Sequence, residues 1–417
     1  MIIASLTILL MSVVSLPFVL ATNDEYPVVG ADVKEISLND HEDMDDLANT
    51  INNALEDHDE VTVTGSRTGG GPDGRIDLYI PAGRTVLWEA GYDYSYGIVL
   101  HGKNVYDEGY DLSGSFIVIG NYEEFALPYL YVCDGVEAEI DRNVIFNYLD
   151  SGVKDDAVLT VNGNLTLNGA GCGAVASDRG VLTVNGDITS NAENCYIKAC
   201  DDSVIYVEGS VTFSADISYI FLADSGRIAI TGSVTADANG EDILLIQVEG
   251  QGGELTAGCV TTSGRGIWVV DGGKVTINGD LSAKGAFAIE SSGEVTINGN
   301  VVAENAGVQS GGGSVVIEGT LTADADHYIG FLRGGTYSDF LHKDDCARTG
   351  DYYVYDGSGL IGTDAFVYVK AYGGTDGTRI IRTPDGGWNT SLILVIVSIA
   401  AAAAAGAVYY YFAKRRQ

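Results

Sequence analysis

Three consecutive segments decide the fold: KVTINGDLSAKGAFAIESSG at residues 274–293, EVTINGNVVAENAGVQSGGG at 294–313 and SVVIEGTLTADADHYIGFLR at 314–333. Each segment opens with an apolar residue at every second position, which is the period of a β-strand with one buried face. A glycine ends that strand, and the alternation then resumes. The segments therefore predict a stack of equivalent β-coils, a solenoid, in which each coil covers the apolar face of the next.

The same pattern extends over a much longer part of the chain. Glycines that end a short apolar strand recur with spacings of 23, 23, 23, 26, 21, 20 and 20 residues. These glycines are Gly163, Gly186, Gly209, Gly232, Gly258, Gly279, Gly299 and Gly319. Because glycine adopts a positive φ without strain, we expect the chain to turn a corner at each of them. Weaker copies of the pattern begin at Val61, Ile76, Ser113 and Ala138, so we expect about 10 to 12 coils.

An asparagine precedes the corner glycine in half of these repeats, at Asn162, Asn185, Asn278 and Asn298. Asparagine hydrogen-bonds the backbone in turns, and stacking places the same position of successive coils side by side. We therefore expect the amides to form ladders that stabilise the turns. The alternative is that the asparagine column is a ligand-binding surface.

The segment before the repeats, HEDMDDLANTINNALEDHDE at residues 41–60, has the period of a helix. The apolar residues on one face of that helix are Met44, Leu47, Ile51, Ala54 and Leu55. Acidic residues crowd its first turn, where they interact favourably with the helix dipole. An uncovered first coil would present an open sheet edge, so we expect this helix to cap the solenoid.

Both ends of the chain are apolar. Residues 1–21 end on a small residue and predict a secretory signal peptide, cleaved before Thr22, with an uncleaved anchor as the alternative. Residues 392–412 are uncharged and would span about 31 Å as a helix, which is enough to cross a bilayer. The basic residues that follow them predict a cytoplasmic tail and an external solenoid. The alternative is a cell-wall sorting signal, because Thr383–Gly387 resembles the Leu-Pro-x-Thr-Gly pattern.

These patterns divide the chain into consecutive parts. They are a signal peptide at 1–21, an N-terminal segment with the capping helix at 22–60, a β-solenoid at 61–335, a C-terminal β module or cap at 336–388, a transmembrane helix at 389–412 and a cytoplasmic basic tail at 413–417. We therefore expect a single-pass membrane protein with its solenoid outside the cell.

The chain is strongly acidic, with 22 basic and 58 acidic residues and a net charge of −36 at pH 7. Such a field repels nucleic acid, so we expect no nucleic-acid partner. It suits divalent cations, and the runs GGGPDGRID from Gly69 and GGTDG from Gly373 resemble calcium-binding repeats, so Ca²⁺ is the one cofactor considered. The alternative is a solvated acidic surface without a bound ion. Acidic pairs near the coil junctions include Asp155–Asp156 and Asp201–Asp202.

Two cysteines and two sequons are candidates for covalent modification. Cys172 and Cys195 are one coil apart, so they should stack on adjacent strands, at a spacing that permits a disulfide. Two buried, stacked thiols are the alternative. Asn164 and Asn389 each begin an Asn-x-Ser/Thr sequon and are possible glycosylation sites.

The sequence offers little for catalysis. Catalysis on a solenoid would require clustered carboxylates or a cation cage at matching positions of successive coils. The column of residues after the corner glycines has no paired acids, and only His101-Gly102 resembles a hydrolase His-Gly motif. We therefore predict no enzymatic activity, no catalytic residue and no metal or cofactor site.

Tyrosines supply the candidate binding residues. Tyr92, Tyr94 and Tyr96 alternate in GYDYSYG, and Tyr129 and Tyr131 alternate likewise. Each group should therefore face one way along a strand. Aromatic rings with polar tips bind sugars and anchor protein partners. The alternative is that these tyrosines pack at strand edges and bind nothing.

The LANTINNAL segment, the VTVTG and IPAGRTVLW segments, and the VTINGDL and VTINGNV coils, together with the apolar ends, carry a resemblance. Over residues 43–332 the chain resembles adhesin-like surface proteins with a right-handed parallel β-helix of the pectate-lyase-like type. The resemblance implies an all-β fold, a right-handed parallel β-helix of 20–23 residues per coil, with an N-terminal capping helix and one C-terminal transmembrane helix. It also implies display on a bacterial or archaeal cell.

The expected function is therefore that of a membrane-anchored, cell-surface adhesin-like protein whose solenoid binds glycans or protein partners. One alternative is a structural component of the envelope or coat without a specific ligand. Another is a carbohydrate-active enzyme, either a polysaccharide lyase or a hydrolase. These three functions differ in what they do to a glycan: an adhesin retains it, an enzyme cleaves it and a coat component ignores it.

Overall fold

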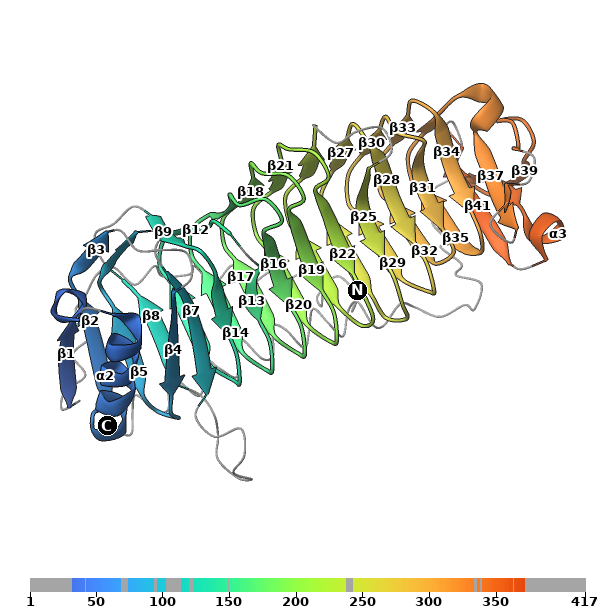
Figure 1. Ribbon diagram of the computed structural model, residues 1–417. Helices are drawn as coiled ribbons and strands as arrows, with labels where there is room; N and C mark the ends of the chain where they lie inside the picture. The colour runs from blue at the N-terminus through green and yellow to red at the C-terminus, as the bar shows by residue number, and fades with distance from the viewer. Residues whose placement is uncertain are drawn as a thin grey trace, which may run out of the picture. The chain divides into compact units, whose positions relative to one another are not determined.

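The computed structural model describes most of residues 32–371, and these form a parallel β-solenoid of about 11 turns (Figure 1). Within that range the description leaves out residues 42, 69–73, 94–95, 103–113, 120–123, 149, 238–242, 334–335, 338–339 and 363. A regular coil contributes one strand to each of three long sheets, which together enclose one apolar core. The parallel β-solenoid predicted from the repeats is confirmed.

We name the three long sheets by their number of strands. The 16-stranded sheet contains, in spatial order, β1 (Val33–Ser37), β2 (Glu60–Thr64), β5 (Thr85–Trp88), β8 (Ser115–Val118), β11 (Glu137–Ile140), β14 (Val158–Val161), β17 (Val181–Val184), β20 (Val204–Val207), β23 (Arg227–Ile230), β26 (Glu254–Ala257), β29 (Lys274–Ile277), β32 (Glu294–Ile297), β35 (Gly313–Ile317), β41 (Ala365–Lys370), β40 (Tyr352–Asp356) and β39 (Ala347–Thr349). The 13-stranded sheet contains β38 (Thr336–Tyr337), β37 (Ile329–Arg333), β34 (Ala306–Ser310), β31 (Phe287–Ser291), β28 (Arg265–Val269), β25 (Leu244–Val248), β22 (Tyr219–Leu222), β19 (Tyr196–Ala199), β16 (Gly173–Ala176), β13 (Ser151–Val153), β10 (Leu130–Val132), β7 (Tyr96–Gly102) and β4 (Gly74–Ile80).

The remaining elements are the third long sheet, a short sheet and the helices. The 10-stranded sheet contains β36 (Leu321–Thr322), β33 (Val301–Ala303), β30 (Leu281–Ala283), β27 (Val260–Thr262), β24 (Val234–Ala236), β21 (Val211–Phe213), β18 (Ile188–Ser190), β15 (Leu165–Leu167), β12 (Asn143–Phe146) and β9 (Glu124–Leu127). The short sheet pairs β3 (Ser66–Thr68) with β6 (Gly91–Asp93). The helices are η1 (Leu38–Asp40), α2 (Met44–Asp57), η2 (Ala325–His327) and α3 (Ser358–Ile361).

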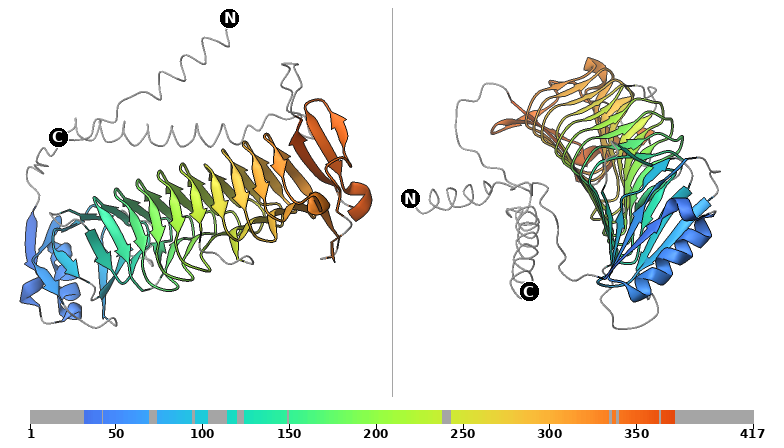
Figure 2. Two further views of the ribbon diagram at one scale, coloured as in Figure 1. Left: turned by 90° about the horizontal axis from the view of Figure 1, so that it is seen from above. Right: turned by 90° about the vertical axis from the view of Figure 1, so that its left-hand side faces the viewer.

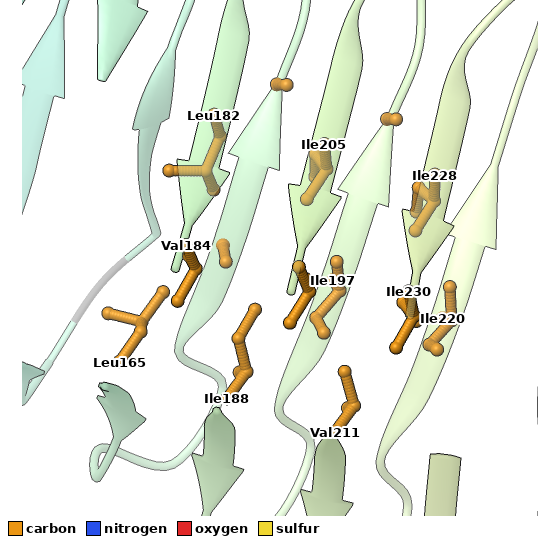
Figure 3. Close-up of a cluster of buried hydrophobic side chains, with 14 of the residues drawn as sticks. Leu165, Leu182, Val184, Ile188, Ile197, Ile205, Val211, Ile220, Ile228 and Ile230 are labelled. Carbon is orange, nitrogen blue, oxygen red and sulfur yellow. The ribbon is translucent and has the colours of Figure 1, made fainter. Parts of the chain in front are cut away.

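The coils stack in register, so equivalent apolar side chains lie on top of one another. In the 16-stranded sheet Leu159 pairs with Leu182, Leu182 with Ile205, and Ile205 with Ile228. All four are at most 1% exposed, and Figure 3 shows three of them in one column. Burial of each such side chain contributes about 1.5–3 kcal/mol. A single coil has only one layer of these residues, so it depends on its neighbours to bury them.

The corner between the 16- and 10-stranded sheets requires glycine for a different reason from the one we expected. The eight corner glycines are absent from the residues with a positive φ. Instead, a Cβ at Gly186 would lie 2.6 Å from the carbonyl oxygen of Gly163 and would overlap the side chain of Asn164. Corners of successive coils therefore approach each other too closely for any side chain.

Asparagine ladders form at the same corner, as predicted. Asn185 Nδ2 donates to Asn162 Oδ1 at 2.8 Å, and Asn298 Nδ2 donates to Asn278 Oδ1 at 3.3 Å. Asn164, after the corner glycine, forms a second type of contact, because its Oδ1 accepts the backbone N–H of Asp187 at 2.9 Å. Side chains at both positions thus satisfy polar groups of the neighbouring coil, and a turn-stabilising role accounts for them.

The acidic pairs near the coil junctions lie in the corner between the 13- and 16-stranded sheets. Asp155 and Asp156 have φ values of 56° and 61°, and the N–H of Ala157 donates to the carbonyl of Lys154 at 3.2 Å. Two successive residues with positive φ inside such a hydrogen bond form a type I′ turn, which favours Asp, Asn and Gly. The backbone conformation of the corner is therefore sufficient to explain these pairs.

Helix α2 caps the first coils, as expected. Its buried face includes Leu47, Ile51 and Leu55, and it lies against the first strands of the stack (Figure 2). On the edge strand β4, the amide of Asn52 replaces a missing neighbouring strand. Its Nδ2 donates to the carbonyl of Asp77 at 2.9 Å and its Oδ1 accepts the N–H of Tyr79 at 2.8 Å. Helix α2 thus covers an edge that would otherwise invite association.

The C-terminal part of the solenoid ends in antiparallel strands. β41 pairs in parallel with β35 and so continues the 16-stranded sheet, while β40 and β39 add to it in antiparallel fashion. The described residues after 335 therefore cap the stack. The predicted signal peptide at 1–21 and transmembrane helix at 389–412 lie outside the described residues. Within the described part of the chain, no helix is long and apolar enough to cross a bilayer.

Candidate binding site

The outer face of the 13-stranded sheet collects aromatic side chains from coils far apart in sequence. Along β10, β19 and β22, buried residues that face the core alternate with partly exposed residues that face outward. Among the described residues, the aromatic side chains exposed at least in part on this face include Tyr79, Tyr129, Tyr131, Tyr196, Tyr219, Phe221 and Trp268. We call one continuous part of this surface the tyrosine strip, and it consists of Arg75, Tyr129, Tyr131, Asp150, Tyr196 and Tyr219.

Tyr129 covers a glycine of the preceding coil. Arg75 pairs with Gly97 in the sheet, and the N–H of Ile98 donates to the carbonyl of Tyr129 at 3.1 Å, so the three coils are adjacent. A Cβ at Gly97 would overlap the phenol end of the Tyr129 ring. The ring can therefore occupy this position only because residue 97 has no side chain. Tyr131 stands next to it, with ring centroids 5.8 Å apart and an interplanar angle of 53°.

Charged groups border the Tyr129 ring. Arg75 Nε donates to Asp77 Oδ2 at 2.6 Å, and this hydrogen bond raises the pKa of the guanidinium. Burial raises the pKa of the Tyr129 phenol, an effect that the nearby Arg75 opposes. The phenol therefore stays protonated at neutral pH and can both donate and accept a hydrogen bond.

The middle of the tyrosine strip centres on a carboxylate. Burial, followed by the effect of the nearby Asp150 carboxylate, raises the pKa of Tyr196. A Cβ at Gly173 would lie 2.6 Å from the Tyr196 ring and 2.9 Å from Asp150 Oδ1, so a second tyrosine also covers a glycine. Tyr219 stacks on Tyr196 with centroids 5.6 Å apart and an angle of 14°. The result is a row of phenol groups around one carboxylate.

Beyond the strip, the same face carries mixed aromatic and charged residues. The Lys198 ammonium lies 5.7 Å from the centre of the Phe221 ring, a cation–π distance. Further along, burial raises the pKa of the Glu290 carboxyl, while Arg265 and a hydrogen bond with Trp268 oppose this. The types of side chain on the outer face therefore change from coil to coil, whereas the core repeats apolar residues at the same positions.

His101, the one histidine with a hydrolase-like context in the sequence, is engaged on both nitrogens. Its Nε2 lies 3.1 Å from Asp77 Oδ1 and its Nδ1 lies 3.4 Å from Asp134 Oδ2. Tyr79 stacks on its ring with centroids 4.9 Å apart. With both nitrogens occupied by carboxylates, this imidazole ties three coils together. Among the described residues, no group of three or more His, Cys, Asp or Glu side chains, this one included, has an arrangement that could hold a metal ion.

The structure separates the two tyrosine groups named from the sequence. Tyr129 and Tyr131 face the same way, as predicted. Tyr92 lies on β6 of the short sheet and Tyr96 on β7 of the 13-stranded sheet, so the prediction that one strand presents them was wrong. Tyr94 lies outside the described residues.

Cys172 and Cys195 stack as predicted, and the structure has them as free thiols, the second of the two alternatives. Each side chain is 0% exposed, and the N–H of Tyr196 donates to the carbonyl of Cys172 at 3.2 Å. The thiols donate to equivalent carbonyls one coil apart, those of Phe146 and Gly169. Burial raises the pKa of Cys172 to about 12, so this thiol is unreactive in the folded protein.

The remaining predictions on modification and metal binding have mixed outcomes. Asn164 is exposed at a corner, although its Oδ1 already accepts a backbone hydrogen bond. The second sequon, at Asn389, lies outside the described residues. So do most of the Gly-Asp run from Gly69 and the whole of the run from Gly373, on which the Ca²⁺ expectation depended.

Sequence reasoning missed Arg75, Asp150, Tyr196 and Tyr219. The repeat length could have revealed them, because Gly173 and Tyr196 are 23 residues, or one coil, apart. A glycine at one position leaves room for the ring of a tyrosine at the same position of the next coil. No protein-family model matches the chain, and no curated protein matches it.

Proposed function

We propose that this chain is a membrane-anchored, cell-surface adhesin-like protein that binds glycan chains on its tyrosine strip. The apolar segments at residues 1–21 and 392–412 support export and anchoring. The resemblance to adhesin-like β-helix proteins supports display at a surface. In this arrangement the solenoid serves as a rigid spacer that holds the strip away from the membrane.

The placement of Tyr129 over Gly97 is the observation that carries the glycan assignment. Sugar rings have apolar faces edged by hydroxyl groups, and aromatic rings with polar tips match both parts. Around Tyr129, the Tyr131 phenol, the Asp150 carboxylate and the Arg75 guanidinium supply hydrogen-bonding groups on rigid strands. A site built on strands holds its geometry better than one built on loops.

Binding can be tested with the full chain in detergent micelles and a panel of insoluble polysaccharides and cell-wall preparations. We expect at least one polysaccharide to retain the protein, and Tyr129→Ala to weaken that retention about 10-fold, equivalent to ~1.4 kcal/mol. Tyr148→Ala is the matched control, because Tyr148 is 54% exposed in a loop outside the strip. Equal retention of the Tyr129→Ala variant would contradict the site.

The same samples separate the alternatives. Released reducing sugar ends would favour the carbohydrate-active enzyme, and absence of both retention and release would favour a structural envelope component. Anchoring needs its own test, in which membranes of producing cells are washed with carbonate at high pH. We expect the full chain to stay in the membrane and a chain ending at residue 388 to be released. Release of the full chain as well would contradict the proposal that residues 389–412 anchor it.

A further inference from the structure

We infer that the ligand of the tyrosine strip is an uncharged, linear polysaccharide that lies extended along the axis of the solenoid. This inference depends on the proposed glycan-binding function and specifies its substrate class. It rests on two observations that are independent of each other: the direction in which the strip extends, and the sign of the charges along it.

The strip is long in one direction only. Its central residues come from successive coils at the same position, because Asp150 lies beside Gly173, Gly173 pairs with Tyr196, and Tyr196 pairs with Tyr219. Tyr129 and Tyr219 are four strands apart in the sheet, from β10 to β22, which at about 4.8 Å per strand is about 19 Å. Across the sheet the strip is only two outward-facing positions wide.

This geometry fits a chain of sugars. An extended chain of hexopyranose units advances per sugar by a distance close to the spacing of the coils. Successive sugars would therefore meet successive coils, so one extended chain would reach from Tyr129, past Asp150, to Tyr196 and Tyr219. A single terminal sugar would contact one or two coils and leave the rest of the strip unused.

The charges on the strip disfavour an acidic sugar. Asp150 lies at its centre, next to Gly173 and the Tyr196 ring, so a carboxylate on the ligand would face a second carboxylate. The positive charges of Arg75, within the strip, and of Lys154 are each balanced by a carboxylate, because Arg75 Nε lies 2.6 Å from Asp77 and the Lys154 ammonium 3.2 Å from Asp155. The whole chain carries −36, which adds a long-range repulsion of anions. Sugar hydroxyls, by contrast, can donate to Asp150 and exchange hydrogen bonds with the phenols.

Lys198 is a cation close to the far end of the strip, two residues along β19 from Tyr196. Its ammonium lies over the Phe221 ring. A single cation there does not reverse the charge of the strip, and its ammonium can also donate to a sugar hydroxyl. Lys198 therefore leaves the preference for an uncharged chain in place.

The test measures affinity of the full chain in micelles for ladders of cello-, chito- and manno-oligosaccharides and of oligogalacturonates, each from two to eight sugars. We expect affinity for one uncharged ladder to rise at least 10-fold between two and five or six sugars and then level off. Oligogalacturonates of equal length should bind at least 10-fold more weakly. Tyr219→Ala should lower the affinity for hexamers and leave dimers unchanged, whereas Tyr219→Phe keeps the ring and should retain most of the gain with length.

Two results would overturn the inference while leaving glycan binding intact: a disaccharide that binds as tightly as the hexamer, or a galacturonate ladder that binds more tightly than every uncharged one. Absence of binding by every ladder and by every polysaccharide in the panel would instead contradict the proposed function itself. Thermal unfolding of both Tyr219 variants verifies that each is folded before its affinity is compared.

Discussion

The outer faces of the 10-stranded and 13-stranded sheets differ, although the same coils build both. On the 10-stranded sheet one outward column keeps threonine over five successive coils, from Thr166 to Thr261, and the hydroxyls of Thr166 and Thr189 lie 3.2 Å apart. On the 13-stranded sheet the matching outward column changes from coil to coil, as it does from Tyr131 to Gly152. Threonine suits any half-exposed strand, so uniformity is what the fold alone produces. A departure from the repeat marks a place where something other than the fold selects the residue.

Both faces depend on the corner glycines for their stability. Replacing one of these glycines should therefore lower the free energy of unfolding more than any other change considered below. In Gly186→Val the added side chain would collide with the backbone of the Gly163 corner. We expect a loss of about 3 kcal/mol or more in the free energy of unfolding, measured by denaturant titration. Gly359→Ala in α3 is the control, because a Cβ there meets nothing within 4 Å and should change stability by no more than ~0.5 kcal/mol. Equal stability of the two variants would contradict the close-approach explanation.

The edge of the 13-stranded sheet offers the next largest effect. Asn52→Ala would leave the N–H of Tyr79 and the carbonyl of Asp77 without their partner. We expect a cost of about 1–2 kcal/mol and faster amide hydrogen exchange at Tyr79. Asn53→Ala changes an exposed residue of the same helix and serves as control. Unchanged exchange at Tyr79 in Asn52→Ala would show that the amide does not protect this edge.

Gly97→Ala tests whether the tyrosine strip depends on a glycine beneath the Tyr129 ring. A methyl group at residue 97 would displace the Tyr129 ring, so we expect glycan affinity to fall about 10-fold, as for Tyr129→Ala. Because both changes remove the same contact, the double variant should bind no more weakly than either single one. Additive losses, which would mean that Gly97 and Tyr129 act separately, would contradict the coupling.

The smallest effect should come from the uniform column. Thr189→Val keeps the shape of the side chain and removes the hydroxyl that meets Thr166. We expect a stability change within about 0.5 kcal/mol, since the group is partly exposed, and no change in glycan retention. A loss of binding comparable to that of Tyr129→Ala would show that the 10-stranded sheet takes part in recognition.

The sequence predicted the stack, its period and the capping helix because buried residues must alternate and repeat for coils to cover one another. It identified the corner glycines but not their reason, since close approach between coils involves backbone atoms 23 residues apart. Tyr129 and Tyr131 could be predicted as a pair from the sequence because they are only two residues apart. Tyr196 and Tyr219 could not be assigned to the same surface, because only the pairing of strands in three dimensions brings them to the strip.

A crystal structure of the protein with the longest oligosaccharide that binds tests the account most directly. We predict sugar density over the 13-stranded sheet from Tyr129 to Tyr219, running along the stack of coils, with Asp150 in hydrogen-bond contact with a sugar hydroxyl. Density on the 10- or 16-stranded sheet or at an end of the solenoid, with the tyrosine strip empty, would contradict the assignment of the binding face.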